Sequence, residues 1–244
     1  MKPHTSPLPP PDPEHAFVLD TERVAIFDLD GTLVDSVDGM TAAINRMLRS
    51  LKAAPLDRQE ATPLLGHGLE RFARRACQLR GVLPTDEDIE RFLHDYRLDP
   101  LSGTQLYHGV NPVLGLLAQT GWRLAVCTNK AEAAALTILD GLGVLGYFDV
   151  VCAGDTVAWP KPDPRHIGQT LQLGGLLGLP AVMIGDNAVD IAAAAAYGIP
   201  CIFASWGYGQ ATGDASACHP AGVFTELPGL LERLVPASHR QPLR

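Results

Sequence analysis

Five short apolar runs alternate along the chain with longer stretches of helical character. The runs cover residues 24–28, 122–128, 148–153, 181–186 and 201–205. Each run is continuously apolar and does not alternate with polar residues, as expected for parallel strands that helices cover on both faces. The pattern therefore predicts an α/β fold with a doubly wound parallel sheet.

The interval between the first run and the second is far longer than one crossover helix requires. Apolar residues recur in it at helical spacing. They form two series, Met40, Ile44, Met47, Leu48 and Leu51, then Leu65, Leu69, Phe72, Ala76 and Leu79, with Pro55, Pro63 and Pro84 as punctuation. We therefore expect an all-helical insert at residues 37–105, between the two parts of an α/β core at residues 17–36 and 106–235.

The two ends of the chain differ in composition from this body. Residues 1–16 are rich in proline and poor in large apolar side chains, so they cannot bury enough surface to offset the entropy of ordering. We expect a flexible Pro-rich tail at residues 1–16 and a second, C-terminal tail at residues 236–244.

Composition and charge exclude several classes of partner. The chain has 244 residues, 46% of them hydrophobic, and a formal net charge of -8, so it would repel a phosphate backbone. No uninterrupted apolar stretch reaches the roughly 18 residues of a spanning helix. The five cysteines are odd in number and lack CxxC spacing. We expect a cytoplasmic protein, monomeric or homodimeric, with no nucleic-acid and no membrane partner.

Polar residues gather where the predicted strands end. They are Asp28 and Asp30, Thr128 and Asn129, Lys161 after the third run, and Asp186 with Asn187. In doubly wound sheets, ligands bind in the crevice beyond the carboxyl ends of the strands. The topology thus brings several carboxylates, a lysine and hydroxyl and amide groups to one place.

This constellation suits phosphoryl transfer with a metal ion. Clustered carboxylates repel one another unless a cation lies among them, and Mg²⁺ suits an all-oxygen site. Asp28 could attack a phosphoryl group as a nucleophile, and Asp30 could protonate the leaving oxygen and later activate water. The donors available to hold the other phosphate oxygens are those of Gly31, Thr32, Thr128, Asn129 and Lys161.

The four ordered segments DLDGTLVDS, TNK, KPDP and GDNAVD resemble the motifs of the haloacid dehalogenase superfamily of phosphohydrolases. The segments YHGVNPVLGLLAQTGWRLAVCTNK, AGDT and WGYG resemble its phosphoglycolate phosphatase branch. The resemblance implies a Rossmann-like core with an inserted helical cap.

The resemblance also implies a role for each matched residue. Asp28 would be the nucleophile, Asp30 the general acid/base, Thr128 a phosphate ligand and Lys161 the partner of phosphate and nucleophile. Mg²⁺ would be held by Asp28, by the backbone carbonyl of Asp30 and by Asp186, with Asp190 acting from behind them. Asn187 and Ala153 depart from the usual serine and glycine of this branch, which leaves the substrate open.

Some residues allow two interpretations. Lys130 could bind phosphate or be a solvated surface charge. Asp35 and Ser36 precede the first insert helix and are expected to cap it. The turn Gly66-His67-Gly68 could enter the site or simply link helices. If the substrate carries a carboxylate, at least one of the arginines that follow this turn, Arg71, Arg74 and Arg75, should face the cleft.

The expected activity is Mg²⁺-dependent hydrolysis of a small phosphomonoester through an aspartyl phosphate, with 2-phosphoglycolate as the leading substrate. Alternatives within the same fold are a sugar-phosphate or pyrophosphate phosphatase and a phosphomutase. A dehalogenase is disfavoured, because Asp30 has no use when halide leaves. A catalytically silent binding module is disfavoured by the complete set Asp28, Asp30, Lys161 and Asp186.

Overall fold

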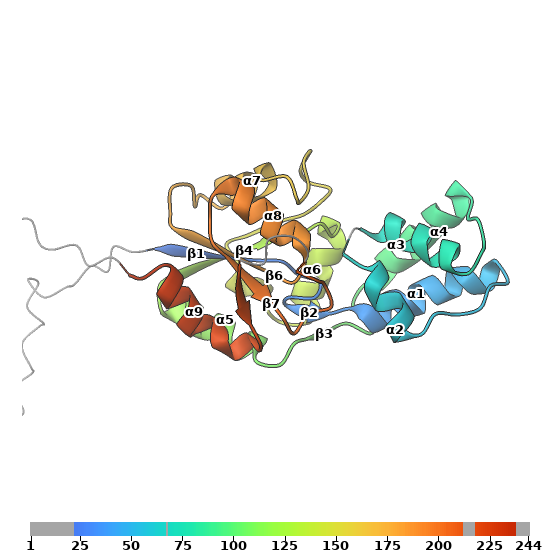
Figure 1. Ribbon diagram of the computed structural model, residues 1–244, viewed down its shortest axis with the longest axis horizontal. Coiled ribbons are helices and arrows are strands. Elements are labelled where there is room, and N and C mark those ends of the chain that lie inside the picture. The colour runs from blue at the N-terminus through green and yellow to red at the C-terminus, as the bar shows by residue number, and fades with distance from the viewer. Residues whose placement is uncertain (1–21, 67, 212–217, 238–244) are drawn as a thin grey trace, which may run out of the picture.

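The computed structural model describes residues 22–66, 68–211 and 218–237. Residues 1–16 of the predicted N-terminal tail, His67, and all but Pro236 and Ala237 of the predicted C-terminal tail lie outside these ranges. In the described part, the core contains a parallel sheet in the order β5-β4-β1-β6-β7-β8 (Figure 1). Its strands are β1 (Arg23–Phe27), β4 (Trp122–Cys127), β5 (Val150–Cys152), β6 (Ala181–Gly185), β7 (Cys201–Ala204) and β8 (His219–Ala221).

Helices cover both faces of this sheet. Helices α5 (Val110–Gln119), α6 (Glu132–Gly141) and α9 (Leu227–Leu234) pack on one face, and α7 (Arg165–Leu173) and α8 (Ala188–Tyr197) pack on the other. Within β1, Ala25 and Phe27 point to the first group, while Val24 and Ile26 point to the second. From Val24 to Phe27 the strand is therefore continuously apolar, because both of its faces are buried. The prediction of an α/β fold with a doubly wound parallel sheet is confirmed.

The five predicted strands agree with the observed ones to within two residues at each end. The pattern missed β8, which contains Pro220 and lies at the edge of the sheet. It also missed the short antiparallel pair β2 (Val34–Asp35) and β3 (Gln105–Leu106), which flanks the insert. Short 3-10 helices cover Thr62–Leu64, Leu145–Tyr147 and Phe224–Glu226.

Between β2 and β3 the chain forms helices α1 (Val37–Ser50), α2 (Arg58–Ala61), α3 (Leu69–Leu79) and α4 (Asp86–Leu98). They pack around a hydrophobic cluster of their own that includes Ile44, Phe72 and Phe92. Leu79, placed in the apolar series by its spacing, is instead 51% exposed at the end of α3. We call residues 37–105 the helical insert.

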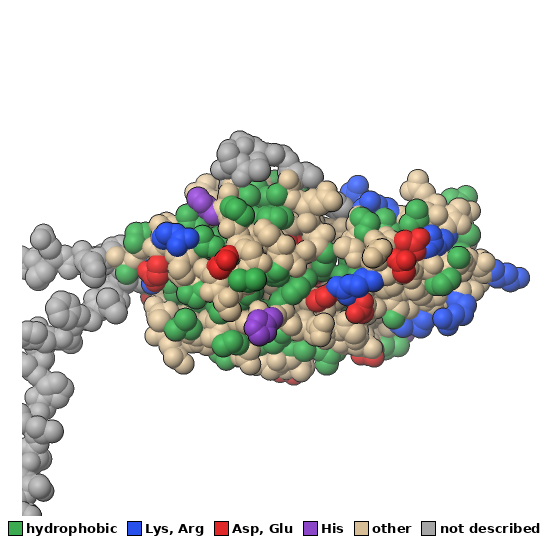
Figure 2. Space-filling model, turned by 60° about the horizontal axis from the view of Figure 1, so that its bottom comes forward, with side chains coloured by type: hydrophobic (Ala, Val, Ile, Leu, Met, Phe, Trp, Pro, Cys, Tyr) green, Lys and Arg blue, Asp and Glu red, His purple; other side chains and the backbone are tan. Residues whose placement is uncertain are grey.

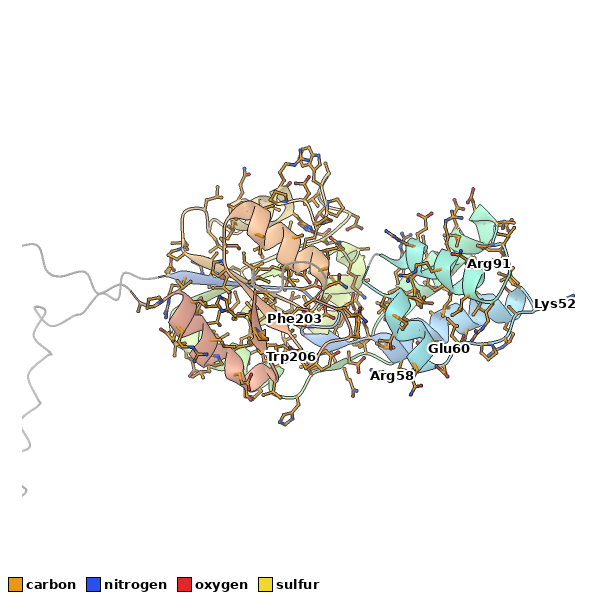
Figure 3. All side chains as sticks on the ribbon, in the orientation of Figure 1. Lys52, Arg58, Glu60, Arg91, Phe203 and Trp206 are labelled. Carbon is orange, nitrogen blue, oxygen red and sulfur yellow. The ribbon has the colours of Figure 1, made fainter. Side chains whose placement is uncertain are left out.

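The helical insert lies beyond the carboxyl ends of β1, β4 and β6, to the right of the core in Figure 1. On the face of the molecule that Figure 2 shows, most of the visible Lys and Arg side chains belong to the helical insert. Arg58 of α2, labelled in Figure 3, donates to Asp35 at 2.6 Å and to Asp38 at 2.7 Å, so it ties the insert to β2. Among the described helices, none is long and apolar enough to cross a membrane.

Candidate active site

A cavity of about 650 Å³ lies between the carboxyl ends of the strands and the helical insert. From the core it is lined by Asp28, Asp30, Thr128, Asn129, Lys130, Lys161 and Asp186, and from the insert by residues of α3 and α4. The parallel sheet explains this convergence, because β1, β4 and β6 are neighbours and all end at the same edge.

Asp28 occupies the position directly after β1. Its amide donates to Ile184 O at 2.9 Å, which continues the pairing with β6, and the residue is 8% exposed. Lys161 Nζ lies 2.9 Å from Asp28 Oδ1, yet this oxygen has no partner with hydrogen-bond geometry. A buried carboxylate oxygen without a hydrogen bond leaves a lone pair for a bound cation or substrate.

Lys161 is a buried ammonium group surrounded by acceptors. Its Nζ donates to Cys127 O and to Asp190 Oδ1, each at 2.6 Å. Burial by itself lowers the pKa of Lys161, but the attraction of Asp190 and Asp28 outweighs burial and leaves the pKa above its ordinary value. Lys161 is therefore a fixed positive charge beside Asp28.

His166, which the sequence did not single out, holds the backbone of Lys161. Its Nδ1 accepts the Lys161 amide proton at 3.2 Å, so Nε2 carries the ring proton and faces Cys152 O at 3.3 Å. Burial, together with the charge of Lys161, lowers the pKa of His166 to about 4, so the ring is neutral. The sequence feature that could have identified His166 is its place in KPDPRH, five residues after Lys161.

Three carboxylates come together at this point. Oxygens of Asp28, Asp186 and Asp190 lie within 4.8 Å of one another. Asp186 Oδ2 accepts the amide protons of Tyr208 at 3.0 Å and Gly209 at 2.8 Å. Burial, and then repulsion from Asp28 and Asp190, raises the pKa of Asp186 well above its ordinary value.

Asp190 is fixed from two sides. Its Oδ1 accepts from Lys161, and its Oδ2 accepts the Asn187 amide proton at 3.1 Å in a capping box at the start of α8. Burial raises the pKa of Asp190 to about 6. Asp190 therefore orients Lys161 and α8, and because each of its oxygens accepts one hydrogen bond, a lone pair on each remains for a cation.

The residues present fit a hard divalent cation. Among the described residues, the carboxylates of Asp28, Asp30, Asp186 and Asp190 are accompanied by two ammonium groups, those of Lys130 and Lys161. Mg²⁺ is suited by the excess of negative charge, by the all-oxygen donors and by Asp28 Oδ1, which lies beside Lys161 but accepts no hydrogen bond. The carboxylate of Asp30 is not one of the three that cluster, so any metal contact of this residue would come from its backbone carbonyl.

The carboxylate of Asp30 is instead bound by side chains. Lys130 Nζ lies 2.9 Å from Oδ1 and 3.0 Å from Oδ2, and Ser36 Oγ donates to Oδ1 at 2.6 Å. The expectation that Ser36 caps the first insert helix is wrong in this respect: Ser36 occupies the N-cap position, but its hydroxyl bonds Asp30 and makes no capping bond. Asp35 Oδ1 does accept the Val37 amide proton, at 3.2 Å.

Of the other predicted phosphate-binding residues, Thr128 and Asn129 line the cavity, whereas Gly31 and Thr32 do not. Thr128 lines the cavity and accepts the Lys130 amide proton at 3.2 Å, which leaves its own hydroxyl proton as a donor. Asn129 also lines the cavity, but its side-chain amide donates to Lys161 O at 2.9 Å, so it links two loops. Both therefore remain candidates for phosphate contact.

Gly31 and Thr32 are not brought to the cavity wall. Their amides donate within the loop, to Val34 O at 2.9 Å and to Leu29 O at 3.2 Å. Trp206, labelled in Figure 3, supports this loop by donating to Thr32 O at 3.0 Å. Phosphate binding by these two residues stays a prediction, and their amides are already engaged.

Gly31 has a different role in the site. Its φ is +84°, and a Cβ added there would lie 2.1 Å from Asp186 Oδ2. We expect Gly31→Ala to displace Asp186 and lower kcat/KM by about 100-fold or more, since small displacements of reacting groups are costly. Gly121→Ala is the matched control, because Gly121 has a similar φ of +82° but a Cβ added there would meet no atom within 4 Å. Equal activity in the two variants would contradict this account.

Comparisons with known proteins agree with this geometry. Residues 25–204 match the haloacid dehalogenase-like hydrolase family. A phosphoglycolate phosphatase of Rhodospirillum rubrum is 39% identical over 196 residues, which covers 77% of this chain and 81% of the relative. A phosphoglycolate phosphatase of Agrobacterium fabrum is 38% identical over 189 residues, covering 76% of this chain and 81% of the relative.

A solved structure extends the similarity to the fold. The crystal structure of a predicted phosphoglycolate phosphatase from Haemophilus somnus 129pt superposes with a TM-score of 0.75 at 25% identity, covering 86% of this chain and 98% of the other. The chain therefore belongs to the haloacid dehalogenase-like hydrolase family, in the branch that resembles phosphoglycolate phosphatases.

Proposed function

We propose that this phosphatase hydrolyses 2-phosphoglycolate with Mg²⁺ bound, through an aspartyl phosphate on Asp28. The observation that carries the proposal is the place of Asp28 in the cavity, where its Oδ1 accepts no hydrogen bond and lies beside the fixed charge of Lys161 and the carboxylate of Asp186. The similarity to phosphoglycolate phosphatases along most of the chain supports the choice of substrate.

Each residue then has one task. Asp28 attacks phosphorus, and Lys161, 2.9 Å from its Oδ1, orients that carboxylate. Thr128 donates to a non-bridging oxygen of the phosphoryl group. Asp30 gives a proton to the leaving oxygen and afterwards takes one from the water that hydrolyses the aspartyl phosphate. Mg²⁺, held by Asp28, Asp186 and the Asp30 carbonyl, would supply positive charge against the phosphoryl oxygens.

We further propose that the helical insert is a cap that selects the substrate. Arg71, Arg74, Arg75 and Arg97 of α3 and α4 line the cavity opposite the carboxylates. Arg74 pairs with Glu70 at 3.0 Å and with Asp86 at 2.9 Å. Within the described residues, Arg71 and Arg97 have no such partner, so they are available to a substrate carboxylate.

A specific observation also favours a second candidate. The cavity of about 650 Å³ is much larger than a two-carbon acid phosphate requires, so a sugar phosphate would also fit. Phosphomutase activity stays a further alternative, and activation by a bisphosphate would reveal it.

We also propose a cytoplasmic monomer or homodimer without nucleic-acid or membrane partners, in keeping with the net charge of -8. Light scattering after size-exclusion chromatography tests the oligomeric state.

The test of the substrate is kcat/KM for 2-phosphoglycolate beside several sugar 6-phosphates and pyrophosphate. We expect the first value to be the highest. A value at least tenfold below the best of the others would refute this substrate and leave the general phosphatase activity.

Arg71→Ala sharpens this test. Losing a charged contact to the carboxylate should raise KM for 2-phosphoglycolate by about tenfold, while KM for a neutral sugar phosphate changes little. Arg91→Ala is the matched control, because Arg91 lies on α4 of the insert (Figure 3) but pairs with Glu87 and does not line the cavity. Equal effects of the two substitutions would exclude Arg71 as the carboxylate contact.

A further inference from the structure

A chain of buried polar contacts joins the helical insert to Asp30. The phenol of Tyr96, on α4, accepts a hydrogen bond from Lys130 Nζ at 2.7 Å. The same Nζ donates to both oxygens of Asp30, at 2.9 and 3.0 Å. The Lys130 side chain is 2% exposed, whereas that of Asp30 is 22% exposed and opens toward the cavity.

This arrangement uses the hydrogen-bonding capacity of Lys130 completely. An ammonium group has three N–H donors, and the two Asp30 oxygens and the Tyr96 hydroxyl provide three acceptors. Lys130 therefore has no donor left for phosphate in this structure.

Tyr96 connects two parts of the fold that meet at the cavity. Its ring belongs to the hydrophobic cluster of the insert and is 2% exposed, so its position follows that of α4. Lys130 comes from the loop after β4, and Asp30 from the loop after β1. The only polar atom that α4 offers to this pair, among the described residues, is the Tyr96 hydroxyl.

Asp30 is also held from the other end of the insert. Ser36, directly before α1, donates to Asp30 Oδ1 at 2.6 Å, and its oxygen lies 3.3 Å from the Tyr208 hydroxyl. The carboxylate thus has contacts from the core through Lys130 and from the start of the insert through Ser36. Only the Lys130 contact is itself tied to a second helix of the insert.

We propose that Lys130 and Tyr96 are positioning residues for Asp30, and that Tyr96 makes the placement of Asp30 depend on the docked insert. Without the Tyr96 acceptor, the buried ammonium group of Lys130 would reorient toward another acceptor. The Asp30 carboxylate would then either move with Lys130 or lose its contact with it. Asp30 is then aligned with a leaving oxygen only while the insert covers the cavity. This inference rests on the proposed role of Asp30 as general acid.

The test separates leaving groups that need a proton from those that do not. Phenyl phosphate needs a general acid, whereas 2,4-dinitrophenolate leaves readily as an anion. The quantity to compare is kcat/KM, which reports the steps up to departure of the leaving group. For Tyr96→Phe, we expect about a tenfold loss with phenyl phosphate and less than about a twofold loss with 2,4-dinitrophenyl phosphate. Lys130→Met should show the same selectivity with a larger loss, about 100-fold.

Two reference variants make the outcome decisive. Asp30→Asn shows whether Asp30 is the acid: if its loss does not depend on the leaving group, the proposed function of Asp30 fails. Tyr147→Phe is the matched control, since it removes a phenol that donates to Asn111 at 2.9 Å outside the cavity. We expect this control to keep full activity with both esters.

The inhibition constant of inorganic phosphate distinguishes positioning from binding. We expect it to be unchanged in Tyr96→Phe and Lys130→Met. If Lys130→Met weakens phosphate inhibition and lowers kcat/KM equally for both esters, Lys130 is a phosphate ligand and the inference is overturned. It is also overturned if Asp30→Asn shows the leaving-group dependence while Tyr96→Phe, folded to the same melting temperature, does not.

Discussion

Replacing Asp28 with asparagine should abolish turnover while the fold remains intact. The amide fills the same volume but cannot attack phosphorus, so no aspartyl phosphate can form. The measurement is single-turnover phosphate release with enzyme in excess over substrate. Asp140→Asn, on the exposed side of α6, is the matched control and should keep full activity.

The melting temperature adds a second readout for Asp28→Asn. Asp28 is one of the charges that raise the pKa of Asp186, so its removal relieves repulsion among buried carboxylates. In metal-free buffer, the variant should therefore melt at the same temperature as the parent or higher. More than a trace of single-turnover activity in a variant that is folded this well would exclude the aspartyl-phosphate mechanism.

The strands were predictable because the sheet is buried on both faces. In β1 every side chain from Val24 to Phe27 is buried, and this run is apolar without alternation. β8 escaped prediction because it is an edge strand, where the exposed His219 and Pro220 are tolerated. The pattern of apolar residues reports burial, so a strand with little burial leaves little trace in it.

The site was predictable to the level of which residues converge, because strand order and strand ends decide that. The partners of each residue were not predictable. From the sequence, Lys130 could either bind phosphate or be a solvated surface charge, whereas the structure places it against Asp30 and Tyr96. Tyr96 reads as an ordinary core residue of a helix, since its ring is buried and only its hydroxyl is functional. Such contacts depend on how loops and helices distant in sequence pack together.

Removing the metal should abolish activity, which is the second large effect that we expect. The carboxylates of Asp28 and Asp186 repel each other and any phosphate, so without a cation the substrate meets an excess of negative charge. Turnover should fall to background in excess chelator and return with Mg²⁺. Ca²⁺ should inhibit, because its looser and higher coordination would let a second Asp28 oxygen bind metal and lose its line of attack.

The pH dependence of stability provides a test of the same site without turnover. A carboxyl whose pKa is raised on folding lowers stability as the pH rises from its unfolded to its folded pKa, because in that range the unfolded chain is ionised while the folded chain stays protonated; above the folded pKa the cost is complete and constant. Burial raises the pKa of Asp190 to about 6 and that of Asp186 well above its ordinary value. The melting temperature of the chelated protein should thus fall as the pH rises from about 4 to about 6 through Asp190, and continue to fall above that through Asp186.

Mg²⁺ should cancel this penalty, so the rise in melting temperature on adding it should be larger at about pH 7.5 than at about pH 5, where protons compete for the carboxylates. Asp186→Asn should lose most of the rise, because it removes a buried charge that faces Asp28, while Asp140→Asn should keep it. Full activity in excess chelator would show that turnover needs no cation, and a Mg²⁺-induced rise that survives in Asp186→Asn would place the cation elsewhere. The buried excess of carboxylates would then need another compensating charge.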